Sequence, residues 1–350
     1  MRAPGWTPDS APDRAAALPH DDRRPVTGLL VRLFGVLLLV AAMALPMAQA
    51  PDRSVESLVA RWAPPPSELI DLKGQLVHYR DEGPRDDPTP IVLLHGTSAS
   101  LHTWDGWAKA LRGTRRVIRL DLPGFGLTGP FTGAYAGQSY TGVNDQRFVL
   151  DLLDRLGVNR FVVAGNSLGG EVAWRIAAAA PQRVAQLVLV DASGHDFEPG
   201  EIPLAWHIAR LPGLATLAEH LLPRALVAQG LRSVYGHPTQ VSEALIDRYF
   251  ELTLRTGNRA ALVQLARQLP DAPGVAHVTG VSAPTLVLWG GRDRVIPPAV
   301  AQRFLADIAG ARLVMFDDLG HVPQEEDPAR TVEPVKAFLA TPPAAPLAAP

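Results

Sequence analysis

The chain has 350 residues, 47% hydrophobic and 19% charged, which is enough apolar material for one large core or two smaller ones. The 33 basic and 35 acidic side chains leave a net charge of -2, and no basic stripe with interleaved aromatics indicates nucleic acid as a partner. The absence of cysteine excludes disulfides, thiolate metal sites and a cysteine nucleophile.

The N-terminal part of the chain is divided into a polar arm and an apolar segment. Residues 1–25 are rich in proline, alanine, aspartate and arginine without apolar periodicity, so we expect a disordered arm. Residues 26–50 follow as an apolar segment whose stretch from Leu33 to Ala50 carries no charge. This segment predicts a membrane-spanning helix, and it also fits the core of a signal peptide.

The charges around this segment predict its orientation. Arg23, Arg24 and Arg32 lie at its N-terminal side, which favours a cytoplasmic N-terminus and an anchored domain outside the cytoplasm, periplasmic if the source is bacterial. The alternative is a protein secreted after cleavage near Ala50, although Pro51 directly after that position disfavours cleavage.

A linker over residues 51–67 leads into a regular pattern that occupies residues 68–196 and 270–340. Short apolar runs that end at glycine or a polar residue are typical of buried strands, and they read IVLLHG, VIRLDLPG, FVVAGNS, LVLVDASG, TLVLWGGRD and RLVMFDDLGH. Helical patterns lie between these runs. The alternation predicts an α/β fold, with a parallel sheet and helices on both faces.

Residues 197–269 interrupt this alternation because they contain only helix-like patterns, such as QVSEALIDRYFELTLR. We expect a helical insertion between two strands of the sheet. Its apolar positions from Leu204 to Leu222 fall close to helical spacing; they pack the insertion onto the core, line an acyl or aromatic pocket, or do both. The low-complexity tail at 341–350 is expected to be disordered.

Reactive side chains recur where the apolar runs end. Ligands of open α/β sheets bind at the carboxyl ends of the strands, so residues at these positions are expected to meet at one edge. They are His95, Asp121, Ser167, Asp191, Asp293 and His321.

Ser167 is the candidate nucleophile. It lies in GNSLG, between a buried strand and a helix, with Gly165 and Gly169 two positions away on either side. A nucleophile on a tight strand-to-helix turn needs such small neighbours, because other Cβ atoms would clash there. The alternative is an ordinary glycine-rich turn that contains a serine.

Serine needs a base, and the base needs an acid that holds its tautomer. His321, after the last apolar run, is the candidate base, and Asp293, after the preceding run, is the candidate acid. Asp191 competes with Asp293 for this role. The order along the chain is then nucleophile, acid and base, at Ser167, Asp293 and His321.

An oxyanion site requires backbone N–H groups aimed at the developing charge. The residue after the nucleophile, Leu168, should supply one, and Thr97 in the loop after IVLLHG should supply the other. His95 is expected to shape this loop and Asp121 to brace it.

Over about residues 68–340 the chain resembles the α/β-hydrolase-fold enzymes, through the motifs HGTSAS, DLPGFG, GNSLGG, GGRDRVIP and GHVPQEEDP. The resemblance implies a mostly parallel eight-stranded sheet flanked by helices, a helical cap over the site, and neither cofactor nor metal. It also implies Ser167, Asp293 and His321 as the triad, with Thr97 and Leu168 as oxyanion donors. Haloalkane dehalogenases and epoxide hydrolases carry aspartate at the elbow, so Ser167 argues against both.

The expected function is therefore that of a serine hydrolase that cleaves a carboxylic ester or related carbonyl compound through an acyl-enzyme, with a small apolar or acyl substrate. One alternative is hydrolysis of a carbon–carbon bond in ring-fission products. Such enzymes usually grip a carboxylate with a cap arginine, for which Arg255 or Arg259 qualifies if it is not simply salt-bridged helix surface. The other alternative is a non-catalytic binding protein on the same fold. The oligomeric state stays open.

Overall fold

The computed structural model describes residues 1, 28–36, 38–39, 50–196, 219–268, 278 and 280–340. The chain divides into two compact units, residues 1–47 and 48–350. In the first unit residues 28–36 and 38–39 are helical, with exposed apolar side chains. None of the helices within the described ranges is both long enough and apolar enough to cross a bilayer. Residues 26–27, 37 and 40–49 of the predicted membrane segment lie outside these ranges.

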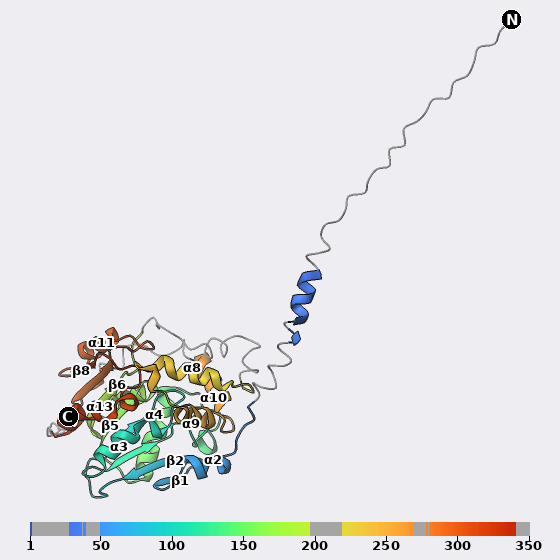
Figure 1. Ribbon diagram of the computed structural model, residues 1–350. Coiled ribbons are helices and arrows are strands. Elements are labelled where there is room, and N and C mark those ends of the chain that lie inside the picture. The colour runs from blue at the N-terminus through green and yellow to red at the C-terminus, as the bar shows by residue number, and fades with distance from the viewer. Residues whose placement is uncertain are drawn as a thin grey trace. The chain divides into compact units, whose positions relative to one another are not determined.

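The second unit is built on an eight-stranded sheet in the order β1-β2-β4-β3-β5-β6-β7-β8 (Figure 1). The strands are β1 Ser67–Leu72, β2 Gln75–Glu82, β3 Ile91–Leu94, β4 Val117–Leu120, β5 Phe161–Asn166, β6 Val184–Val190, β7 Thr285–Gly290 and β8 Arg312–Phe316. β2 is antiparallel to β1 and to β4, whereas all other neighbours are parallel. The predicted mostly parallel, eight-stranded sheet is confirmed.

The burial of each strand explains its sequence. Every residue of β3, β5, β6 and β7 is buried, because these parallel strands are covered on both faces and need no alternation with polar residues. The edge strand β8 is only partly buried. The β1–β2 hairpin turns at Lys73 and Gly74, whose φ angles of 57° and 84° suit the left-handed geometry of a tight hairpin.

Helices cover both faces of the sheet. On one face lie α4 (Gly142–Arg155), α5 (Leu168–Ala179) and α11 (Ala299–Asp307), whose Phe148, Trp174 and Phe304 belong to the main core. On the other face lie α3 (Asp105–Leu111) and α13 (Pro328–Leu339), which contribute Trp107 and Val335 to a second cluster. The short elements are η1 Leu101–Trp104, η2 Gly133–Tyr135 and α12 Pro323–Glu326.

Helices also form the described part of the insertion between β6 and β7. They are α8 (Arg224–Val234), η3 (Pro238–Gln240), α9 (Glu243–Thr253) and α10 (Asn258–Gln268) (Figure 1). α8 and α9 share an apolar cluster that includes Leu231 and Ile246. Residues 197–218 and 269 of the predicted insertion lie outside the described residues, and so do most of the apolar positions expected to line a pocket.

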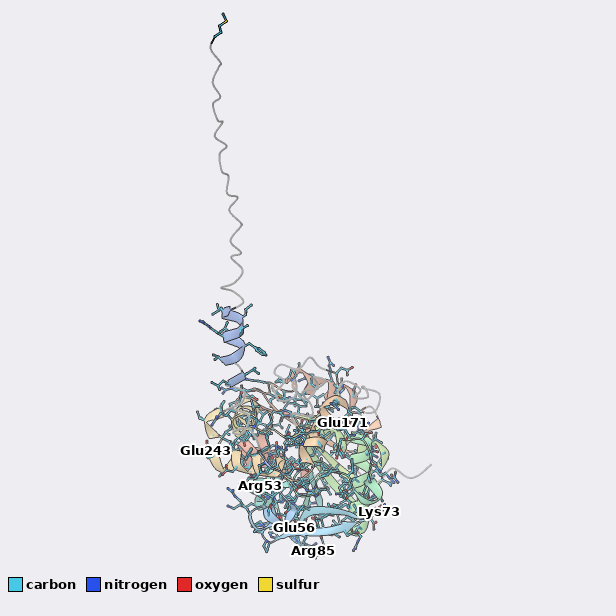
Figure 2. The ribbon with its side chains drawn as sticks, turned by 90° about the vertical axis from the view of Figure 1, so that its right-hand side faces the viewer. Arg53, Glu56, Lys73, Arg85, Glu171 and Glu243 are labelled. Carbon is cyan, nitrogen blue, oxygen red and sulfur yellow. The ribbon has the colours of Figure 1, made fainter. Side chains whose placement is uncertain are left out.

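The segment predicted as a linker, 51–67, includes helix α2 (Val55–Trp62). Its Leu58 packs with Leu127 and with Leu252 of α9. We call residues 52–62 the strap. Arg53 and Glu56 of the strap are labelled in Figure 2, in the lower half of the second unit. The strap therefore lies against the insertion as well as the core.

Candidate active site

Ser167 lies on a strained turn between β5 and α5. Its φ of 54° and ψ of -118° are unusual for a residue with a side chain, and such strain persists only where the surroundings enforce it. A Cβ on Gly165 would lie 2.0 Å from the carbonyl oxygen of Gly169, and one on Gly169 would lie 2.2 Å from that of Leu94. The turn can therefore form only if both flanking residues lack a side chain.

Asp293 and His321 meet after two neighbouring strands, β7 and β8. His321 Nδ1 lies 2.7 Å from Asp293 Oδ2, and both side chains are buried. The other oxygen of Asp293 accepts N–H bonds from Val295 (2.8 Å) and Ile296 (3.0 Å). Because a carboxylate only accepts, Nδ1 of His321 must carry the proton, which leaves Nε2 free to act as a base.

Asn166 joins the turn of Ser167 to the loop of His321. Its Nδ2 donates to the carbonyl oxygens of His321 (2.9 Å) and Val190 (3.1 Å). The backbone N–H of His321 in turn donates to the carbonyl oxygen of Val234, at the end of α8, over 2.7 Å. The structure brings the three predicted triad residues to one edge of the sheet, but records no hydrogen bond between the Ser167 hydroxyl and His321. Such bonds are often long in unliganded hydrolases.

The predicted oxyanion donors lie beside Ser167. A Cβ on Gly96 would be 3.0 Å from the Cβ of Ser167, so the loop that carries Thr97 passes directly over the turn. Within the described ranges, the backbone N–H groups of Thr97 and Leu168 have no protein partner. Leu168 is the first residue of α5, where N–H groups lack intrahelical partners and the helix dipole favours negative charge.

His95 supports this loop as a neutral imidazole. Its Nδ1 donates to the carbonyl oxygen of Gly96 (2.8 Å), and its Nε2 accepts the N–H of Leu122 (2.9 Å). Complete burial lowers the pKa of His95, against the opposing charge of Asp121. This pattern accounts for His95 as a structural residue, as the sequence indicated.

Asp121 is the brace that the sequence predicted. Its carboxylate accepts the N–H groups of Leu101 (2.7 Å) and Leu127 (2.8 Å), and it bonds to His78 Nδ1 (2.7 Å). Burial by itself would raise the pKa of Asp121, but the charge and hydrogen bond of His78 outweigh burial and hold that pKa below its usual range. We call residues 95–100, the segment between β3 and η1 that carries Thr97, the oxyanion loop. Asp121 thereby fixes the start of η1, directly after this loop.

Asp191, the competing acid, lies at the end of β6 and is fully buried. Its Oδ1 accepts the N–H of Gly290 (2.9 Å), and it forms no hydrogen bond with His321 among the described residues. One oxygen of Asp191, one of Asp293 and one ring nitrogen of His321 lie within 4.8 Å of one another, a spacing that a metal ion could also use. The structure joins His321 directly to Asp293 through the hydrogen bond of 2.7 Å.

His102 connects the strap to the oxyanion loop, a link that sequence reasoning missed. Its Nε2 donates to the carbonyl oxygen of Trp62 (2.8 Å), and its Nδ1 accepts from the Ser100 hydroxyl (3.0 Å). Burial, with the positive charges of Arg248 and Arg80, lowers the pKa of His102 to about 3 despite the charge of Asp121. The apolar positions in VESLVARW recur at helical spacing and signal α2, but nothing in them identifies His102 as its partner.

The two candidate cap arginines differ in their contacts. Arg255 donates to the carbonyl oxygens of Thr256 (2.7 Å) and Thr128 (3.3 Å). Arg259 is buried, and one of its nitrogens donates to Asp52 of the strap over 2.5 Å. Its Nε and Nη1 are buried without a partner in the part of the chain that the structure describes. Neither arginine is simply part of an exposed, salt-bridged surface.

A cleft of about 470 Å³ separates the strap, α9 and α12, but neither Ser167 nor His321 lines it. A cavity of about 10 Å³ lies closer to the oxyanion loop, between that loop and the insertion. Its lining includes Ser98, Phe125, Leu252, Asn258 and Leu262.

The fold and the residues at its edge define an α/β hydrolase. A family model described as the alpha/beta hydrolase family matches residues 91–333, a range that contains Ser167, Asp293 and His321. The chain belongs to this family.

Three similar proteins illustrate the range of the family. A dihydrolipoyllysine-residue acetyltransferase component of the acetoin cleaving system from Pseudomonas putida is 32% identical, over 79% of this chain and 70% of that protein. A 2-hydroxy-6-oxononadienedioate/2-hydroxy-6-oxononatrienedioate hydrolase from Klebsiella pneumoniae is 27% identical, over 71% of this chain and 86% of that one. The crystal structure of a bacterial membrane phospholipase A superposes with a TM-score of 0.66 at 25% identity, and covers 91% of this chain and 98% of that one.

Proposed function

We propose that the protein is a serine hydrolase that cleaves a carboxylic ester through an acyl-enzyme. The observation that carries the proposal is the combination of the strained turn at Ser167 with the buried hydrogen bond between Asp293 and His321. A strained residue whose turn excludes flanking side chains is costly to maintain, and such costs concentrate at functional sites.

The proposed reaction begins when Ser167 Oγ attacks the ester carbonyl carbon while His321 Nε2 takes its proton. Asp293 stabilises the resulting imidazolium through Nδ1. The N–H groups of Leu168 and Thr97 receive the negative charge of the tetrahedral intermediate. His321 then protonates the leaving alcohol, and water, deprotonated by the same imidazole, releases the acid from the acyl-enzyme.

Two considerations favour an ester. The site supplies a nucleophile, a base and oxyanion donors, which suffice for acyl transfer without a further reagent. The similar membrane phospholipase A matches 91% of this chain, so its likeness extends over more of the chain than the family model does. We therefore place long-chain acyl esters, including phospholipids, among the first substrates to be tested.

Hydrolysis of a carbon–carbon bond is the second candidate. Arg259 favours it, because a buried guanidinium, two of whose nitrogens have no partner among the described residues, would bind a substrate carboxylate. The similarity to the Klebsiella pneumoniae hydrolase supports the same reading. In this case Arg259→Met would raise the KM for a carboxylated vinylogous 1,5-diketone and leave that for a neutral ester unchanged.

The test of the proposal is a substrate panel with two serine variants. Ser167→Ala should abolish hydrolysis of p-nitrophenyl and phospholipid esters and labelling by a fluorophosphonate probe. Ser193→Ala is the matched control, because Ser193 donates its N–H to the carbonyl oxygen of Ser167 over 3.1 Å and its hydroxyl has no proposed role. Ester hydrolysis that survives Ser167→Ala would refute the proposal, and absence of labelling in the parent would favour a non-catalytic binding protein.

We also propose that residues 26–50 anchor the protein in a membrane, with residues 68–196 and 270–340 as an extracytoplasmic core and 197–269 as a cap. The uncharged stretch up to Ala50 and the arginines before it support this arrangement. Membrane fractionation and N-terminal sequencing of the mature protein test it. A soluble protein that begins near Pro51 would replace the anchor with a cleaved signal peptide.

A further inference from the structure

Asp191 is held firmly by its surroundings, but it has no role in the proposed reaction. It follows β6 directly, between the strands that lead to Ser167 and to Asp293. Its φ of 45° is a left-handed conformation, in which aspartate, asparagine and histidine are enriched among residues with side chains. Its backbone N–H donates to Leu288 (3.0 Å), and its Oδ1 accepts from Gly290 (2.9 Å). The other oxygen, Oδ2, is buried and has no donor among the residues that the structure describes.

The neighbours of Asp191 decide where its proton lies. Asp293 is the better anion of the two, because it accepts two backbone N–H groups and the ring N–H of His321. Asp191 accepts only one N–H, and its carboxyl group lies within 4.8 Å of both other groups. Two buried carboxylates this close cannot both be ionised without a large penalty, so the proton belongs on Asp191.

A third carboxylate adds to this effect. Glu326 of α12 is held by three backbone N–H groups, those of Gly236, His237 and Gly320. Burial and then the charge of Asp293, with a smaller contribution from the charge of Glu326, raise the pKa of Asp191 well above its usual range. The N–H of Gly290 opposes this shift but does not cancel it.

We propose that Asp191 is a positioning residue that keeps its proton on Oδ2 and donates it in a hydrogen bond to the Asp293 carboxylate. Such a bond would satisfy the one polar atom of Asp191 that lacks a donor and would give Asp293 its fourth hydrogen bond, which fills the capacity of a carboxylate.

This bond has a chemical consequence for His321. The fourth donor would hold the Asp293 carboxylate in one orientation, and this carboxylate holds the imidazole of His321 through Nδ1. Asp191 would thus fix the orientation of Asp293 and, through it, that of His321. The kinetic part of this inference rests on the proposed function, whereas the protonation state of Asp191 does not.

The experiment compares Asp191→Asn with Asp191→Ala in the full-length protein. Asparagine reproduces a protonated aspartate, because its carbonyl accepts from Gly290 and its amide donates to Asp293. Asp191→Asn should therefore keep both kcat and KM within about twofold of the wild type. Asp191→Ala removes the donor and leaves Asp293 and His321 less firmly oriented, so kcat should fall by about tenfold while KM stays within about twofold.

Asp293→Asn is the matched control, and it should lose about 10³–10⁴-fold in kcat/KM because it cannot hold the correct tautomer of His321. An Asp191→Asn protein as impaired as Asp293→Asn would overturn the proposal, since Asp191 would then act as an ionised acid. A kcat of Asp191→Ala that matches the wild type would overturn it as well.

A readout without turnover separates this inference from the proposed function. Carbon-13 NMR of aspartate labelled at the side-chain carboxyl carbon, assigned with Asp191→Asn, should show Asp191 protonated at pH 7 in the wild type. An ionised Asp191 at that pH would overturn the inference even in an active esterase. A protein that hydrolyses no ester but keeps Asp191 protonated would refute the proposed function alone.

Discussion

The amide of Asn166 provides the sharpest test of how the site is held together. Asn166 is buried, and its Nδ2 donates to Val190 and to His321. Asn166→Ala removes both bonds and leaves two buried carbonyl groups short of a donor, which should cost about 2–4 kcal/mol of stability at about 1–2 kcal/mol per bond. The variant also releases the backbone of His321, and a shift of about 1 Å in a catalytic group can cost about a hundredfold in rate.

Asn258 supplies the matched control for this experiment. Its Nδ2 also donates to two carbonyl oxygens, those of Gly126 (2.9 Å) and Leu252 (2.8 Å), and the residue is equally buried, but it joins the insertion to the core. Urea unfolding should show similar losses for Asn166→Ala and Asn258→Ala. Esterase kinetics should show a drop in kcat of about tenfold to a hundredfold only in Asn166→Ala. Equal kcat values in the two variants would mean that the position of His321 does not depend on this amide.

Three further predictions concern other parts of the site. Gly165→Ala should lower the free energy of unfolding by at least about 3 kcal/mol and slow fluorophosphonate labelling, because the new Cβ would lie 2.0 Å from a backbone oxygen. Gly230→Ala, on the open surface of α8, is the control and should be neutral or stabilising in the same thermal unfolding experiment. In the unfolded chain His102 takes up a proton when the pH falls below its usual pKa of 6.5, whereas in the folded chain it does so only near pH 3. The free energy of unfolding therefore decreases as the pH falls from 6.5 towards 3. Between pH 7.5 and 5 the wild type should lose roughly 2 kcal/mol more than His102→Gln, and parallel curves would contradict the assignment. Glu251→Ala should lower the free energy of unfolding by about 1–2 kcal/mol and speed tryptic cleavage in the strap, because Trp62 Nε1 loses its hydrogen-bond partner at 2.8 Å. Glu243→Ala is the control, because Glu243 lies exposed on the same helix and its loss should change neither quantity.

The sequence was informative where one local pattern determines one local structure. Fully apolar runs that end at glycine identified the buried strands, and the carboxyl-end rule placed Ser167, Asp293 and His321 at one edge. Small residues around Ser167 indicate a tight turn, because only a crowded backbone requires glycine on both sides. These inferences succeed because strand burial and turn crowding act over a few residues.

Contacts between distant segments were beyond such reasoning. Glu251 and Trp62 are separated by 189 positions, and nothing in either local pattern predicts their bond. The spatial order of the strands, in which β4 lies between β2 and β3, is equally a property of the folded chain. Asp191 was considered only as a substitute for Asp293, because a one-dimensional pattern does not reveal that two carboxyl groups share one buried space.

Because of the strap, we expect the shortest functional fragment of the protein to begin before both the family match and the sheet. The family model starts at residue 91 and the sheet at Ser67, but the carboxylate of Glu251 contacts Arg53, Arg61 and Trp62, and His102 holds the carbonyl oxygen of Trp62. A tether pulled at its N-terminal end would therefore load the insertion and the oxyanion loop before it loaded the sheet. The strap, the insertion and the oxyanion loop thus form one mechanically connected part of the molecule.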